Sequence, residues 1–277
     1  MKGNYLTILL VYFLCSFSLI GEVIGSHFRF GSLSWSRDAS TANDVYTLIL
    51  DLHIAYRRVQ WVGNMEVGDT YGVWDSLYWG DQDSDSLQNL TVTPGGIFFG
   101  ESSNDDWSDS RGFMKHTYDE AFLNDTLDNN NGLFKIKVQS CCRIGSWDDY
   151  TFYTTVNVTE FKAYGASPKA SIFPLLTMSS GTGDPMTAKV SASTDGGRAL
   201  KYEWVDGAVM CESAWAWFFP YECENGNDRG AILNNDTGVI TWTTNLEGLI
   251  PMQIYVYDPK TNSGTSVDFI VKLIDGV

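Results

Sequence analysis

Residues 46–56 read YTLILDLHIAY, and their alternating pattern indicates the fold class. Its apolar side chains occupy every second position: Tyr46, Leu48, Leu50, Leu52, Ile54 and Tyr56. A period of two is typical of a β-strand with one buried face, because successive side chains point to opposite sides of a sheet. We therefore expect Asp51, His53 and Arg57 on the opposite face of this strand, with Asp51 and His53 as an exposed pair.

Shorter runs of the same kind recur along the chain, and each predicts a strand: residues 28–35, 134–138, 150–158, 188–192, 200–204, 239–242, 252–257 and the final 267–277. Clusters of Gly, Asn, Asp and Ser, which favour turns, separate them. Many short strands with polar turns indicate an all-β protein made of sandwiches or barrels. Small and rigid residues at 165–168 mark a boundary, so we expect two tandem β-sandwich domains, residues 26–165 and 166–277.

The N-terminus has the pattern of a signal peptide. Lys2 precedes an uncharged apolar run at residues 5–20, and Val23 and Gly25 take positions −3 and −1 if cleavage falls before Ser26. The run is short for a membrane span, which needs about 20 residues. We therefore expect residues 1–25 to be removed on export, with an uncleaved anchor as the alternative. No apolar tail follows the last strand, so we expect neither a second span nor a lipid-anchor signal.

The charge of the chain limits its partners. The formal net charge is −16, and removing residues 1–25 leaves it unchanged because Lys2 and Glu22 leave together. Nucleic acids and anionic membranes need clustered Lys and Arg, so we expect neither as a partner. The expected location is secreted or cell-surface, and the expected partners are other extracellular proteins, further copies of the chain or glycans.

Export to an oxidising compartment would allow the cysteines to form disulfides and the sequons to be glycosylated. Cys141, Cys142, Cys211 and Cys223 remain after signal cleavage, an even number with three possible pairings. We favour Cys211–Cys223, which flank a short loop, and leave Cys141 and Cys142 as a vicinal disulfide or as thiols. Four acceptor sequons predict N-glycosylation in a eukaryotic source, at Asn89, Asn124, Asn157 and Asn235.

Three segments of the first predicted domain resemble polycystic-kidney-disease-type (PKD) domains. Residues 78–81 (YWGD) resemble the F-G-D core, residues 116–118 (HTY) match the H-x-Y element, and residues 132–138 match the following strand. Gln82 stands where Gly is usual, and a dozen residues intrude between Tyr118 and Gly132. The resemblance implies a decorated PKD-like β-sandwich.

A wider pattern concerns the start of the mature chain. Residues 27–31 (HFRFG), Trp35 and residues 141–144 (CCRI) resemble a group of secreted proteins that open with an H-F-R-x-G strand. This resemblance implies location and fold more than function.

The second predicted domain is similar to cadherin-like and immunoglobulin-like extracellular domains. The resemblance is carried by residues 195–197 (DGG), 200–204 (LKYEW), 236–242 (DTGVITW) and 255–258 (YVYD). The calcium-binding D-x-D-G-D pattern of these domains is interrupted by Thr194 and Gly197. Such modules imply an adhesive, matrix or filament role, although a fold alone does not determine function.

An aromatic cluster lies between Cys211 and Cys223: Trp215, Trp217, Phe218, Phe219 and Tyr221. On a disulfide-closed loop these rings would form a platform for sugar rings or for an apolar patch of a partner protein. The alternative is that they fold back and cover the end of the sandwich.

Two acidic groups suit Ca²⁺, which prefers hard oxygen ligands. Asp81, Asp83 and Asp85 alternate, and Asp105, Asp106 and Asp109 form a second group. The first run lacks the glycine and the final acid of an EF-hand, with Ser86 and Val92 at those positions. A solvated acidic loop is the alternative. We expect no other cofactor.

Histidines supply one further metal hypothesis. His27 would become the N-terminal residue if cleavage fell after Ser26, and with His53 or His116 it would resemble the copper brace of lytic polysaccharide monooxygenases. The chain has no G-x-S-x-G elbow, H-E-x-x-H pair or phosphate-binding Gly-rich loop. We therefore expect a non-enzymatic extracellular structural or adhesive protein, with a subunit of a surface or extracellular filament as one form of that role. A secreted carbohydrate-binding protein is the second hypothesis, and a metal-dependent polysaccharide-active enzyme is the third.

Overall fold

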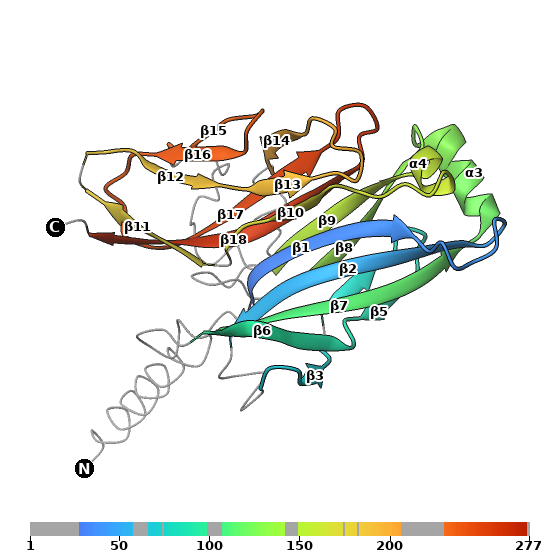
Figure 1. Cartoon of the computed structure of the whole chain (residues 1–277), viewed down its shortest axis with the longest axis horizontal. Helices are drawn as coiled ribbons and strands as arrows, with labels where there is room; N and C mark the ends of the chain where they lie inside the picture. Colours follow the sequence, from blue (N-terminus) through green and yellow to red (C-terminus); the bar gives the residue numbers. More distant parts are fainter. Residues whose placement is uncertain are drawn as a thin grey trace, which may run out of the picture.

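The computed structural model in Figure 1 describes residues 28–57, 66–73, 75–98, 107–141, 149–173, 175–181, 183–205 and 230–275. Strands dominate these residues, and the two helices among them are short, α3 (Glu120–Asn129) and α4 (Val158–Lys162). The all-β fold class expected from the alternating pattern is therefore confirmed. In the described ranges no helix has the length and apolar character that crossing a bilayer requires.

In the described part of the first lobe, nine strands form two facing layers, with α3 and α4 at one end (Figure 1). One layer runs β3-β6-β7-β2-β1, and the other runs β9-β8-β4-β5. The strands are β1 (Phe28–Arg37), β2 (Tyr46–Arg57), β3 (Thr70–Tyr71), β4 (Ser76–Tyr78), β5 (Ser84–Ser86), β6 (Leu90–Phe98), β7 (Trp107–Tyr118), β8 (Leu133–Cys141) and β9 (Asp149–Asn157).

The core of this lobe is built by the alternation that the sequence shows. Leu48, Leu50, Leu52 and Ile54 of β2 are fully buried and belong to one apolar cluster. Burying an aliphatic side chain of this size contributes about 1.5–3 kcal/mol relative to exposure. The intervening side chains of β2 lie on the opposite face, where Asp51 and His53 line a groove with β10 of the second lobe.

The described residues of the second lobe also form nine strands. In one layer β11, β18, β17 and β14 are hydrogen-bonded in that order, and the other layer holds β12-β16-β15 and β10-β13 (Figure 1). The strands are β10 (Lys169–Ser171), β11 (Leu175–Ser180), β12 (Met186–Lys189), β13 (Ser191–Ser193), β14 (Lys201–Trp204), β15 (Ile232–Leu233), β16 (Val239–Trp242), β17 (Gly248–Tyr257) and β18 (Gly264–Asp275). A second apolar cluster, which includes Trp242 and Phe269, fills the space between the layers.

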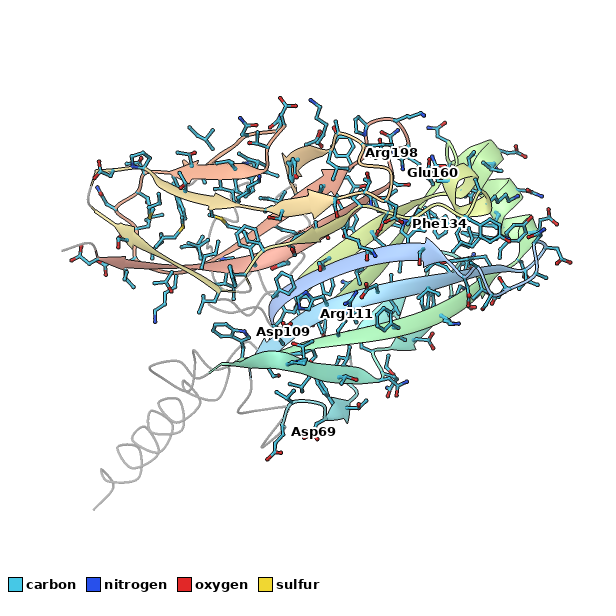
Figure 2. All side chains as sticks on the ribbon, in the orientation of Figure 1. Asp69, Asp109, Arg111, Phe134, Glu160 and Arg198 are labelled. Atoms are coloured by element: carbon cyan, nitrogen blue, oxygen red, sulfur yellow. The ribbon has the colours of Figure 1, made fainter. Side chains whose placement is uncertain are left out.

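The last strand joins the two lobes. β18 pairs antiparallel with β1 and β9 of the first lobe and with β17 of the second, and it pairs parallel with β11 of the second lobe. The hydroxyl of Thr154 donates to the carbonyl oxygen of Gly264 over 2.7 Å. Arg198 forms ion pairs with Glu160 of the first lobe (3.1 Å) and with Asp258 of the second (2.7 Å), and Figure 2 shows Arg198 beside Glu160.

The predicted domain boundary falls in the segment between these lobes. Residues 165 and 166 lie between α4 and β10, and Ala166 forms an isolated bridge with Ser36 of β1. The two apolar clusters divide near this point, except that Phe30 and Ala55 of the first lobe belong to the second cluster. The division into two domains stays a prediction.

The three segments that resemble PKD domains lie together in space. The ring of His116 stacks on Trp79 at 4.8 Å, and the hydroxyl of Tyr118 donates to the carbonyl oxygen of Trp79 over 2.8 Å. A Cβ on Gly80 would lie 2.7 Å from the carbonyl oxygen of Lys135 in β8. The residues that intrude between Tyr118 and Gly132 form α3. The PKD relationship itself stays a prediction.

Candidate functional site

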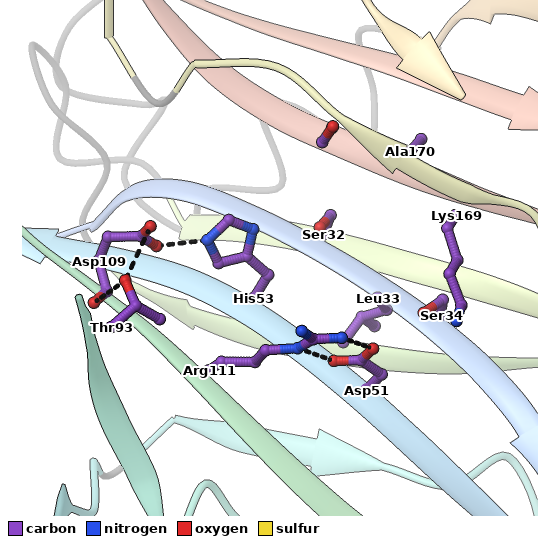
Figure 3. Close-up of a pocket in the computed structure, with 11 residues that line it drawn as sticks. Ser32, Leu33, Ser34, Asp51, His53, Thr93, Asp109, Arg111, Lys169 and Ala170 are labelled. Atoms are coloured by element: carbon purple, nitrogen blue, oxygen red, sulfur yellow. Dashed lines mark hydrogen bonds and ion pairs between the residues drawn. The ribbon is translucent and has the colours of Figure 1, made fainter. Parts of the chain in front are cut away.

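A polar groove of about 380 Å³ lies where the outer face of the first lobe meets β10 of the second lobe (Figure 3). We define the polar groove by its polar lining residues: Ser32, Ser34, Asp51, His53, Thr93, Asp109, Arg111, Lys169 and Ser171. An adjoining hollow shares Ser34, Asp51, Arg111 and Lys169 with the groove and adds Phe113 and Lys115. The two spaces form one continuous surface feature.

Strand register brings these side chains to one face. In the antiparallel pairs, His53 of β2 lies opposite Ser32 of β1 and opposite Arg111 of β7. Asp51 lies opposite Ser34 and Phe113 in the same way. Because side chains at every second position share a face, all six residues point away from the first-lobe core. β10 of the second lobe then forms the opposite wall with Lys169 and Ser171.

Two diagonal ion pairs fix the floor of the polar groove. Nε of Arg111 donates to Oδ1 of Asp51 over 2.7 Å, and Nη2 of Arg111 donates to Oδ2, so the pair is bidentate. This hydrogen bonding raises the pKa of Arg111. Bidentate guanidinium–carboxylate pairs have a fixed planar geometry, which holds both side chains in place. Asp109 and Arg111 project from the same strand, β7 (Figure 2).

The second pair joins His53 and Asp109. Nε2 of His53 lies 2.5 Å from Oδ1 of Asp109, within ion-pair distance, although the approach does not meet the geometry of a hydrogen bond. The hydroxyl of Thr93 lies 3.3 Å from Oδ2 of Asp109, to which it donates. The ring of Phe30 meets the His53 ring edge to face at 4.8 Å. His53 is therefore held from two sides.

Two lysines complete the charge pattern of the surface. Nζ of Lys115 lies 2.6 Å from Oδ2 of Asp38, and the Lys115 ion pair holds the pKa of Asp38 well below its usual range. Lys169 is exposed on β10 and extends toward Ser34 (Figure 3). Within the ranges that the structure describes, no carboxylate forms an ion pair with Lys169. The groove therefore offers fixed acceptors, fixed donors and one available ammonium group.

The aspartates predicted to bind Ca²⁺ are divided by the structure. Asp81 and Asp83 approach His116, and one ligand atom from each of the three lies within 4.8 Å of the others. Oδ2 of Asp81 is 2.7 Å from Nε2 of His116. Asp85 instead accepts a hydrogen bond from Nε1 of Trp79 over 2.8 Å. Calcium binding stays a prediction, and Asp81 and Asp83 are the pair from the first run that lies in one cluster.

The two described histidines do not share a site. His53 lies opposite Arg111 on the outer face of the sheet, whereas His116 lies opposite Leu48 on the face toward the first-lobe core. One metal ion cannot bind both. The copper hypothesis depends on His27, which lies outside the described residues.

Other predicted site residues also lie outside the described residues. These are the signal peptide 1–25 and Asp105, Asp106, Cys142, Cys211, Trp215, Trp217, Phe218, Phe219, Tyr221 and Cys223. Cys141 is the last residue of β8. The disulfide pairing and the aromatic platform therefore stay predictions.

The four sequon asparagines differ in their surroundings. Asn89, Asn124 and Asn235 are exposed. Asn157 is half-buried, and both ends of its side-chain amide are occupied. Its Oδ1 accepts a hydrogen bond from the backbone N–H of Glu160 (3.0 Å), and its Nδ2 donates to the carbonyl oxygen of Thr261 (2.7 Å).

Sequence reasoning placed Asp51 and His53 on one face but missed their partners. Both are partly buried, because Asp109, Arg111 and β10 surround them. The sequence contains part of the signal, since Asp109, Arg111 and Phe113 alternate with Ser110 and Gly112 in the manner of a strand. Nothing local in residues 169–171 indicates that they form a wall of this groove.

The fold and the groove together define a two-lobed all-β protein with a groove lined by polar side chains between its lobes. Residues 29–159 match the family described as "Integrin beta-like protein A-E, N-terminal". Over 281 residues the chain is 22% identical to "Integrin beta-like protein A" of Dictyostelium discoideum, covering 96% of this chain and 13% of that protein. The chain thus spans only a small part of the length of this relative.

Among solved structures, the chain has a weak similarity to tandem immunoglobulin domains of titin, with a TM-score of 0.24 and 8% identity over 89% of this chain and 99% of that one. A second is an endo-fucoidan hydrolase of glycoside hydrolase family 107, with a TM-score of 0.25 and 14% identity over 87% of this chain and 35% of that one. These scores are too low to define a shared fold.

Proposed function

We propose that this protein is a secreted or cell-surface adhesion protein that binds extracellular partners through the polar groove and acts without catalysis. The observation that carries the proposal is the match of residues 29–159 to the integrin beta-like family. That segment contains β1, β2, β6 and β7, the strands that form the floor of the groove. The segment with the family resemblance therefore also carries the candidate binding surface.

The geometry of the groove favours binding over chemistry. Asp51 is held by Arg111, and Asp109 is held by His53 and Thr93, so each carboxylate has a fixed partner. Side chains that hold one another in place give a preorganised surface, and preorganisation lowers the entropy lost on binding. The same pairing keeps the carboxylates from acting as unpaired acids or bases.

A cell-binding measurement tests the proposal. The tagged full chain is added to intact cells of the source species, and surface binding is measured by flow cytometry. The test variant is the double substitution Arg111→Ala and Lys169→Ala, and the matched control is Lys189→Ala, an exposed lysine on β12 of the second lobe. We expect saturable binding that the double variant loses and the control retains.

Two outcomes contradict the proposal. If the wild-type chain shows no saturable binding, the proposed adhesive role is wrong. If the wild type and the double variant bind equally, the polar groove is not the binding surface. Size-exclusion chromatography of the same preparations separates a monomeric adhesion protein from a filament subunit, because a filament elutes as large particles.

A further inference from the structure

The polar groove and its adjoining hollow are less acidic than the chain as a whole. The chain carries a net charge of −16, yet at this surface the three cations Arg111, Lys115 and Lys169 balance the carboxylates of Asp51, Asp109 and Asp38, the last of which pairs with Lys115. Arg111 is paired with Asp51 inside the groove, which leaves the ammonium group of Lys169 available there. A field of one sign repels ligands of that sign, so an anionic ligand meets less repulsion here than over an acidic surface.

Two hydroxyl groups in the groove have no hydrogen-bond partner among the described side chains and backbone groups. Ser32 and Ser34 are 7% and 8% exposed, and both line the groove (Figure 3). Among the residues that the structure describes, neither side-chain hydroxyl has a hydrogen-bond partner. A serine hydroxyl both donates and accepts, and nearby carboxylates accept only. Such a lining matches a ligand that is itself rich in hydroxyl groups.

An exposed aromatic ring extends the surface. Phe113 is 59% exposed and lines the adjoining hollow, and the guanidinium of Arg111 lies 5.1 Å from the centre of its ring. An aromatic ring offers a flat apolar face beside polar groups. A sugar ring presents the same combination of an apolar face and polar edges, so Phe113 suits the next unit of a saccharide chain.

The floor of the groove disfavours an extended peptide. β1, β2 and β7 are interior strands, each paired on both sides. Their backbone groups are occupied by the sheet, so a peptide cannot add to these strands as a further one. Recognition on this floor must come from side chains, and those available are hydroxyls, carboxylates and cations.

From these four observations we infer that the polar groove binds an acidic polysaccharide whose charge is carried by carboxylates, as in a chain of uronic acids. The saccharide hydroxyls contact Ser32, Ser34 and the carboxylates, its carboxylate contacts Lys169, and a neighbouring sugar ring packs on Phe113. This inference rests on the proposed function and adds the chemical class of the ligand.

Titration calorimetry with defined saccharides tests the ligand class. The probe is an oligomer of galacturonic acid, compared with a neutral galactose oligomer of equal length, a sulfated dextran and polyglutamate. We expect the full chain to bind the uronate oligomer in preference to the other three. Removing a hydrogen bond to a charged group weakens binding by about tenfold to a hundredfold, and we expect Lys169→Ala to cause a loss of that size.

Matched variants locate the binding site. Phe113→Ala is expected to weaken uronate binding with little effect on the melting temperature, because its ring is largely exposed. Lys189→Ala removes an equivalent exposed charge outside the groove and is expected to leave the affinity within a factor of about two, as for a distant surface charge. Lys169→Gln, which keeps the length of a long polar side chain, is a second variant in case Lys169→Ala lowers the melting temperature.

Several outcomes overturn the inference, and they are separable from the proposed function. Equal binding of neutral and acidic oligomers, tighter binding of polyglutamate or sulfated dextran, or equal losses in Lys169→Ala and Lys189→Ala each contradict it. Groove-dependent cell binding without uronate binding refutes the ligand class and leaves the adhesive role in place. If the wild-type chain binds neither cells nor the uronate oligomer, both the adhesive role and the ligand class are wrong.

Discussion

At the scale of single residues, Asp75 places a carboxyl group inside the aromatic core of the first lobe. It is 7% exposed, and its Oδ2 accepts hydrogen bonds from the hydroxyls of Tyr56 and Tyr150. Asp75→Ala leaves two buried hydroxyls without their acceptor, at a cost of about 1–3 kcal/mol each. We expect Asp75→Asn, which keeps an acceptor oxygen, to lose less, and urea unfolding of both variants measures the difference.

The same residue makes stability depend on pH. Burial raises the pKa of Asp75 above its ordinary value of 3.8, against the opposing effect of the hydrogen bonds from Tyr150 and Tyr56. The folded state then favours the protonated carboxyl, and this contribution is lost as pH rises through the folded-state pKa. The unfolding free energy of the wild type, relative to Asp75→Asn, should fall above pH 3.8 and then level off. A constant difference across pH would contradict the assignment.

Asn157 carries a second residue-scale prediction, because it both begins α4 and links the two lobes. Loss of a helix N-cap costs about 0.5–2 kcal/mol, and loss of the hydrogen bond to Thr261 about 0.5–1.5 kcal/mol more. We expect Asn157→Ala to be destabilised by that sum. Thr159→Ala removes the same sequon but keeps the amide, so it should retain wild-type stability.

The engaged amide also distinguishes Asn157 from the other sequons. A glycan on its Nδ2 would displace a half-buried contact between the lobes. In protein secreted from eukaryotic cells we expect glycopeptides at Asn89, Asn124 and Asn235 but not at Asn157. Mass spectrometry of tryptic peptides measures occupancy, and a glycan at Asn157 in folded protein would be the opposing result.

At the scale of elements, Gly80 fixes the β4–β5 turn against β8. Its φ is 95°, and a Cβ there would lie 2.7 Å from the carbonyl oxygen of Lys135. Gly68 has the same φ of 95° and no atom within 4 Å of such a Cβ. Both Ala substitutions carry the cost of a left-handed backbone, about 1–2 kcal/mol, and Gly80→Ala adds a backbone clash. Thermal melts should show the larger loss for Gly80→Ala, and equal losses would contradict the steric argument.

The sequence predicts elements well where alternation is local and poorly where contacts are distant. The pattern at residues 46–56 predicts β2 and its buried face, because the period of two is set by the pleat of the strand itself. Helix α3 was missed, since only Leu123 and Thr126 of its residues are buried and its apolar pattern is correspondingly weak. The wall of the groove that β10 forms was not predicted, for another reason. Lys169 and Ser34 line the same groove although more than a hundred residues separate them in the chain, and no local pattern predicts so distant a contact.

At the scale of the whole molecule, β18 makes the lobes depend on each other. Its first residues supply hydrogen-bonding partners to β1 and β9, and the hydroxyl of Thr265 donates to the carbonyl oxygen of Leu33. Without β18 these two strands would expose unpaired edges, which promote aggregation. The groove has the same dependence, because its floor and its wall come from different lobes.

Calorimetry of the full chain tests this dependence through one substitution in each core. Leu123→Ala acts only on the first apolar cluster, and Trp242→Phe acts only on the second. Large-to-small substitution of a buried leucine costs about 2–5 kcal/mol. If the lobes unfold as one cooperative unit, both variants lower the midpoint of a single transition. Two transitions, with each variant shifting only one of them, would show that the lobes are independent and that the groove between them is not held rigid by β18.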